Sequence, residues 1–144
     1  MSDIMNNEEI ESVRLEFPFG LLGFEDCKHF ILEKSEYKPF YWLQSEENRN
    51  LSFLVIDPFI CFSDYEADVD DSFLSQIDIA SADDVMVLTI ITIPGGGKNI
   101  TANLEGPLVI NRKNKKGIQA ILSDPRWTTK HEIKPESVKG GAEC

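Results

Sequence analysis

The sequence predicts a mostly-β fold: a single compact antiparallel domain, barrel-like or a sandwich, with one or two short helical turns. Three observations lead to this prediction. Short runs rich in β-branched and aromatic residues recur at roughly strand spacing, turn residues separate them, and long stretches with helical periodicity are missing. The 144 residues suit one domain, which we place at 1–134 with a frayed start, followed by a flexible tail at 135–144.

The strongest strand signal covers residues 84–94 (DVMVLTIITIP). The run is aliphatic and β-branched at odd and even positions alike. We therefore expect a strand that is apolar on both faces, lying between two layers or in a barrel whose outside is covered. Pro94 and the glycines at 95–97 end it, because proline lacks a ladder donor and glycine permits a tight reversal. A buried helix is the alternative, but strand propensity and the proline–glycine stop favour a strand.

The first half of the chain predicts several shorter strands. Residues 13–17 alternate apolar and charged side chains, which is typical of a half-buried strand. The following runs are aromatic or aliphatic, and an acidic turn at 45–50 separates two of them. They predict strands at residues 29–34, 40–44, 51–56 and 59–62.

The second half predicts a little helix and a hairpin. One or two helical turns are expected at 73–77, with Asp71 or Ser72 as the N-cap, and a turn at 81–84 then leads into the long strand. Beyond the glycines we expect three strands, of which the last two pair across a turn at 111–116. These strands are predicted at residues 100–104, 108–110 and 117–122.

Residues 17–24 (FPFGLLGF) hold apolar side chains between glycines. In one interpretation Phe17, Leu21 and Phe24 pin this loop to the core. In the other interpretation these side chains are exposed and form an apolar docking surface. The sequence leaves both open.

The net charge of -11 restricts the partners of the protein. It argues against a nucleic-acid surface, which needs Lys and Arg, and favours basic partners or simple solubility. No run is long and apolar enough to cross a bilayer, and residues 1–12 do not resemble a secretory signal, so we expect a cytoplasmic protein without membrane contact. Cys27, Cys61 and Cys144 are expected to be reduced thiols, not disulfides or zinc ligands.

Residues typical of catalysis or cofactor binding do not cluster along the chain. His29 and His131 lack partners at ligand spacing, so we expect surface or packing roles for them. The run at 95–98 (GGGK) lacks the spacing and the Ser/Thr of a phosphate-binding loop. The basic residues at 112–116 are interpreted as solvated turn charges. We expect no enzyme, metal or cofactor, although the fold could still bring distant residues together. A small-ligand-binding or enzymatic β-barrel is therefore kept as the alternative.

The most informative segment is residues 64–71 (DYEADVDD), with acids at every second position. In an extended chain the carboxylates of residues 64, 66, 68 and 70 line one face, opposite Tyr65, Ala67 and Val69. The segment lacks the Gly and Glu that an EF-hand loop requires. It is either a solvated strand edge whose charges prevent aggregation, or a surface that docks a basic protein.

Three stretches of this chain resemble the FliW family of flagellar assembly factors, and the likeness extends over residues 13–135. They are FPFGLLGF at 17–24, DYE at 64–66 and, most specifically, TANLEGPLVIN at 101–111. The resemblance implies an antiparallel, barrel-like β domain without enzyme activity. It also implies two partners in the cytoplasm, flagellin and CsrA, a small basic RNA-binding translational repressor.

The resemblance further implies a partner switch. A free FliW-like protein antagonises CsrA and relieves repression of flagellin synthesis, and accumulating flagellin titrates it away. We assign the acidic segment to CsrA and an apolar loop region to flagellin, while Asn103 either closes a turn or contacts a partner. Whether the partners compete is left open, and a monomer is the working expectation for the free protein. The CsrA set is Asp64, Tyr65, Glu66, Asp68, Asp70 and Asp71, and the flagellin set is Leu21, Leu22, Phe24 and Asn103.

Overall fold

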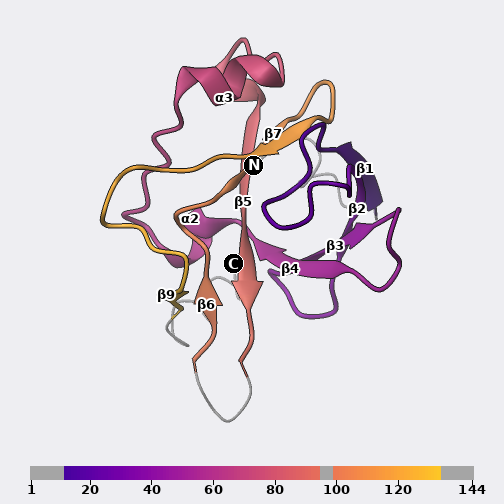
Figure 1. The fold of residues 1–144 in the computed structure, drawn as a ribbon. Coiled ribbons are helices and arrows are strands. Elements are labelled where there is room, and N and C mark those ends of the chain that lie inside the picture. The colour runs from indigo at the N-terminus through magenta and orange to yellow at the C-terminus, as the bar shows by residue number, and fades with distance from the viewer. Residues whose placement is uncertain (1–11, 95–98, 134–144) are drawn as a thin grey trace.

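A computed structural model describes residues 12–94 and 99–133. Its first half is an antiparallel meander of four strands, each hydrogen-bonded to the next (Figure 1). The strands are β1 (Ser12–Glu16), β2 (His29–Lys34), β3 (Tyr41–Ser45) and β4 (Ser52–Ile56). The four strands predicted at 13–17, 29–34, 40–44 and 51–56 are confirmed to within a residue at each end.

The long predicted strand is also confirmed, as β5 (Val85–Thr92). Its last residues pair with β4 on one side and with β6 (Thr101–Ala102) on the other. Its first four residues pair with β7 (Leu108–Asn111). Figure 1 shows β5 running the length of the molecule, with α3 near its start and β6 near its end. β5 is therefore the strand on which both halves of the fold are assembled.

The remaining strands complete a strongly curved sheet. β7 forms a hairpin with β8 (Gly117–Gln119), as predicted, and β9 (His131–Glu132) pairs with β6. The edge of β1 meets the start of β8 at a single parallel bridge between Glu16 and Lys116. The sheet is therefore barrel-like, but no continuous ladder closes it.

Two buried clusters explain why β5 is apolar on both faces. Inside the curved sheet, side chains of β1 to β5 and β7 form the main core, to which Met86 and Leu88 belong. On the outside, Ile91 belongs to a second cluster that includes Tyr65 and Trp127. At the start of the strand, Val85 packs against a third cluster beneath α3 (Asp71–Gln76). β5 is thus covered by apolar side chains on both faces, as the sequence predicts.

Two predictions about local structure need correction. The strand predicted at 59–62 is wrong, because these residues lie in α2 (Pro58–Cys61) and at its C-cap. Asp57 caps this helix by accepting a hydrogen bond from the Phe59 N–H at 2.9 Å, and Pro58 suits the first helical position. The predicted helical turns are present as α3, but the helix starts earlier and its N-cap is Asp70.

Other boundaries differ by a few residues. The strand predicted at 100–104 is only Thr101–Ala102, and that at 117–122 ends at Gln119. The turn predicted at 81–84 contains a short 3₁₀ helix, η1 (Ala82–Asp84). The frayed start, the glycines at 95–97 and the tail at 135–144 lie outside the described residues. Within those residues, no helix is long and apolar enough to span a bilayer.

Candidate partner-binding surfaces

The acidic segment connects α2 to α3 without joining the sheet. Residues 65–70 belong to no helix or strand, so the predicted sheet edge is wrong. The predicted alternation is nevertheless present. Asp64, Glu66, Asp68 and Asp70 are exposed, whereas Tyr65 is buried and Ala67 and Val69 are half-buried. Alternation reports which side faces the core, and it does not require a neighbouring strand.

Tyr65 fixes this segment to the body of the domain. Its side chain is only 4% exposed, and its hydroxyl donates a hydrogen bond to the Leu104 carbonyl oxygen at 2.8 Å. Its ring meets Trp127 edge to face, with centroids 4.9 Å apart, and burial raises its pKa. Tyr65, a predicted contact residue, therefore anchors the acidic row, and the carboxylates beside it face solvent.

One carboxylate of the row is already paired with an arginine. Arg126 donates to Glu66 and to Asp124, both at 2.7 Å, and its guanidinium lies 4.8 Å from the centre of the Trp127 ring. The hydrogen bonds from Arg126 lower the pKa of the Asp124 carboxyl. Arg126 carries no sequence signal for this role, because its pairing with Glu66 spans 60 residues of chain.

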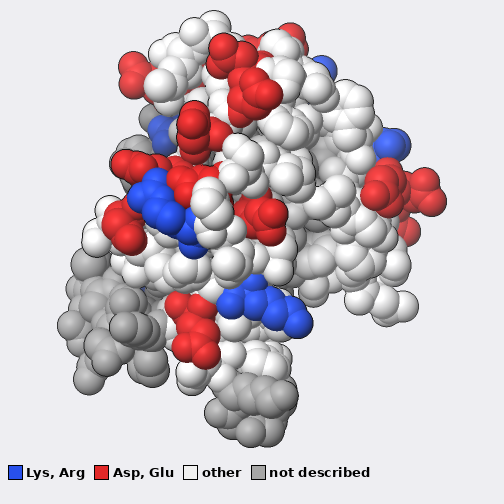
Figure 2. Space-filling model, turned by 60° about the vertical axis from the view of Figure 1, so that its left-hand side comes forward, with Lys and Arg blue, Asp and Glu red and all other residues white. Residues whose placement is uncertain are grey.

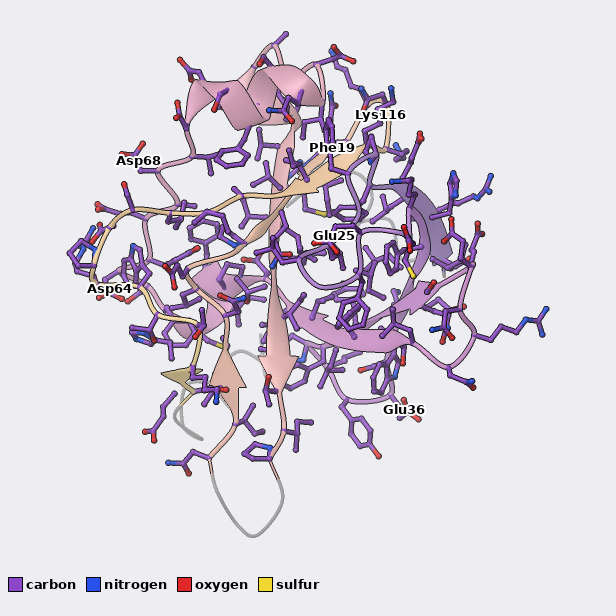
Figure 3. All side chains as sticks on the ribbon, in the orientation of Figure 1. Phe19, Glu25, Glu36, Asp64, Asp68 and Lys116 are labelled. Atoms are coloured by element: carbon purple, nitrogen blue, oxygen red, sulfur yellow. The ribbon has the colours of Figure 1, made fainter. Side chains whose placement is uncertain are left out.

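The other carboxylates of the row carry uncompensated charge. Among the described residues, Asp64, Asp68 and Asp70 form no ion pair. Figure 2 shows acidic side chains gathered on this face, with few basic ones between them. Figure 3 shows Asp64 and Asp68 projecting outward on the same side of the molecule. This face can therefore attract a positively charged surface.

An apolar groove of about 670 Å³ lies beside the acidic row. Val69, Leu74 and Ile79 form one part of its wall, and Val85 and Val87 of β5 form another. Asp68 and Asp71 are the charged residues among those that line it. The groove was not predicted, because it is formed by segments from both sides of α3.

The loop at 17–24 satisfies both sequence interpretations, each with different residues. Phe17 and Leu21 are buried and pin the loop to the core. Phe19, Leu22 and Phe24 are 53%, 59% and 40% exposed and form an apolar surface. Phe24 also packs edge to face on Phe53, with centroids 5.4 Å apart. Of the predicted flagellin residues in this loop, Leu22 and Phe24 are thus accessible.

Gln119 joins this loop to the TANLEGPLVIN stretch. Its Oε1 accepts a hydrogen bond from the Leu22 N–H at 2.9 Å, and its Nε2 donates to the Gly106 carbonyl at 3.0 Å. The Gly106 N–H in turn donates to Asn103 Oδ1 at 2.8 Å, so Asn103 closes a turn. The predicted residues Leu22 and Asn103 are thereby brought into one network. The only sign of this network in the sequence is that Gln119, a polar residue, stands between two apolar ones. These neighbours, Ile118 and Ala120, are both buried.

The remaining polar candidates have local roles. His29 Nδ1 lies 2.8 Å from Glu47 Oε2, and the His131 ring packs against Phe62 and Trp127, so the predicted surface and packing roles are confirmed. The basic residues 112–116 lie in the β7–β8 turn, as predicted. Cys61 is a buried free thiol whose pKa burial raises to about 11. No group of three metal-ligating side chains is found in the described part of the chain.

Comparison with known proteins decides the family. A family model described as FliW protein matches residues 4–133. The chain belongs to the FliW family. A FliW crystal structure superimposes with a TM-score of 0.77 at 39% sequence identity, covering 85% of this chain and 86% of that chain. The resemblance drawn from the three sequence stretches is confirmed.

Curated FliW proteins are similar over most of their length. The flagellar assembly factor FliW of Treponema denticola is 48% identical over 122 residues, which are 85% of this chain and 83% of the relative. That of Bacillus subtilis is 45% identical over 122 residues, with 84% and 85% covered. In this FliW chain, Figure 3 shows Phe19 well apart from Asp64 and Asp68. The apolar loop and the acidic row are therefore two separate surfaces.

Proposed function

We propose that this FliW-family protein is a non-enzymatic flagellar assembly factor that binds flagellin and antagonises the repressor CsrA in the cytoplasm. The observation that carries this proposal is the exposed row of carboxylates held outward by buried Tyr65. Free protein relieves repression of flagellin synthesis, and accumulating flagellin withdraws it. Flagellin level is thereby coupled to flagellin translation.

The charge of the row supports a basic partner. Asp64, Asp68 and Asp70 repel one another by up to about 1 kcal/mol for each close pair at the surface, and a cationic partner relieves that repulsion. Glu66 contributes less to partner binding, because Arg126 already pairs with it. A repressor that must present positive charge to RNA fits this surface.

The same charge gives a mechanism for antagonism. An acidic protein bound beside an RNA-binding surface makes the approach of phosphates unfavourable, in addition to any direct contact. This mechanism is tested with variants in which uncharged side chains replace carboxylates of the row and which still bind CsrA. If such variants still displaced RNA fully, charge repulsion would not be the mechanism.

The apolar loop supports flagellin binding at the second surface. Phe19, Leu22 and Phe24 expose apolar area that the amphipathic helical ends of flagellin can cover before export. Leu21 serves as an internal support, since its side chain is buried. Two separate surfaces are compatible with a switch in which one partner affects binding of the other.

The experiment is calorimetry with CsrA at low and high salt. The variant Asp64→Lys/Asp68→Lys reverses two unpaired charges of the row, and Glu33→Lys/Glu36→Lys makes the same change at exposed positions elsewhere. We expect the first variant to weaken binding strongly, mainly at low salt, and the second to have little effect. Equal affinity of both variants and the unmodified protein would overturn the acidic docking surface.

A further inference from the structure

We propose that the groove beside α3 seats a basic amphipathic helix of a protein partner. Its apolar side chains would enter the groove, and its Lys or Arg side chains would pair with Asp68 and Asp71 at the rim. This inference deepens the proposed function and rests on it, because both rim carboxylates belong to the acidic segment.

The wall of the groove favours an apolar occupant. Val69, Leu74, Ile79, Val85 and Val87 supply hydrocarbon, and the volume of about 670 Å³ lies in the range of ligand-binding clefts. Burying apolar area against such a wall is favourable at about 25 cal/mol per Å². An occupant with several aliphatic side chains on one face therefore fits best.

The polar groups of the groove do not suit a small polar ligand. The hydroxyls of Ser75 and Ser81 are both engaged locally, the first donating to the Ser72 carbonyl and the second accepting from the Asp83 N–H, each at 3.2 Å. The charged groups that line the groove are the carboxylates of Asp68 and Asp71, which attract cations. Charge complementarity therefore selects a basic segment over a neutral or acidic one.

The arrangement of β5 favours a helix over an added strand. Val85 and Val87 are two residues apart, so their side chains lie on one face of the strand and both line the groove. Val87 pairs with Val109 of β7, and both side chains line the groove, so the groove lies over the face of these paired strands. The occupant therefore packs on a face of the sheet, as an amphipathic helix does with side chains at i, i+3 and i+4.

A synthetic peptide provides a direct test. The probe is a helical peptide with leucine on one face and lysine on the other, and its control has glutamate in place of lysine. Binding to the full chain is measured by calorimetry, and peptide helicity by circular dichroism. We expect the lysine peptide to bind and gain helicity, and the glutamate peptide not to bind.

A neutral substitution then separates the groove from nonspecific charge attraction. Ser75 is exposed on α3 and lines the groove, so Ser75→Trp fills it, whereas Ser72→Trp makes the same change at an exposed position that does not line it. We expect Ser75→Trp to weaken peptide binding about tenfold or more, equivalent to ~1.4 kcal/mol, and Ser72→Trp to leave it unchanged. Equal binding by both variants would overturn the inference.

The remaining outcomes distinguish this inference from the proposed function. If reversing the acidic row weakens CsrA binding while Ser75→Trp changes neither CsrA nor peptide binding, the acidic surface stands and the groove inference fails. If the peptide binds in the groove but CsrA ignores both surfaces, the groove inference stands and the assignment of CsrA fails. Self-association that Ser75→Trp abolishes would assign the groove to a second copy of the chain and overturn the inference.

Discussion

The backbone N–H of Leu22 donates a hydrogen bond to the side chain of Gln119 at 2.9 Å, across 97 residues of sequence. The same side chain donates to the Gly106 carbonyl. Gln119 thus links the exposed apolar loop at 17–24 to the turn that Asn103 and Gly106 form. The shape of the proposed flagellin surface depends on this link.

Replacing Gln119 with leucine is expected to loosen the loop. The change removes both hydrogen bonds, and we expect a loss of about 1–2 kcal/mol in the free energy of unfolding. Amide hydrogen exchange at Leu22 should accelerate, and flagellin binding should weaken. Gln119→Glu keeps the acceptor for Leu22 and should retain protection of that amide. Unchanged exchange at Leu22 in the leucine variant would contradict the positioning role of Gln119.

Two glycines of the loop provide a second test. Gly20 has φ +69°, and a Cβ there would lie 2.6 Å from the backbone of Glu25, whereas Gly23 has φ +86° and open space around it. Gly23→Ala should cost about 1 kcal/mol from backbone strain alone. Gly20→Ala should cost clearly more, because the loop must also shift. Urea unfolding compares the two, and equal effects would indicate that the close approach at Gly20 is unimportant.

Removing the Tyr65 hydroxyl tests whether this residue anchors the acidic row. Tyr65→Phe keeps the ring contact with Trp127 but leaves the Leu104 carbonyl without its partner. We expect the free energy of unfolding to fall by about 1–3 kcal/mol. Tyr37→Phe makes the same change at a residue that is 65% exposed and should be nearly neutral. Similar stability of the two variants would argue against the anchor.

Arg126 is expected to affect the pH dependence of stability. The hydrogen bonds from Arg126 hold the pKa of Asp124 below its unfolded value. The resulting stabilisation is therefore complete above the unfolded pKa, about 4, and is lost as the pH falls through the lower folded value. Arg126→Ala should raise the Asp124 pKa towards its ordinary value, as measured by NMR titration. An unshifted carboxyl titration in this variant would contradict the pairing.

The sequence predicts features that depend on local side-chain pattern, and it misses those that depend on contacts between segments distant in the chain. The run at 84–94 identifies β5, because side-chain pattern and strand propensity agree there. The strand predicted at 59–62 fails because aromatic residues suit a strand, although Asp57 and Pro58 already carried a helix-start signal. The hydrogen bonds of Gln119 and the ion pair between Arg126 and Glu66 join distant segments and leave little trace in one sequence.

In the acidic segment, too, the sequence predicts the local feature and misses the long-range one. Its alternation correctly predicts which side chains face solvent, since that depends only on extended geometry. Whether the segment pairs in a sheet depends on neighbours that the pattern does not encode. The groove beside α3 has no local signal, because its wall is drawn from β5, β7 and the segments on both sides of that helix.

The central claim is that this protein works as a switch between two protein partners, and one titration tests it most directly. CsrA bound to a fluorescent RNA is mixed with increasing amounts of the protein, and flagellin is then added while RNA anisotropy is recorded. We predict that the protein releases the RNA and that flagellin restores RNA binding. RNA that stays bound to CsrA throughout, with no complex between the protein and either partner, would contradict the claim.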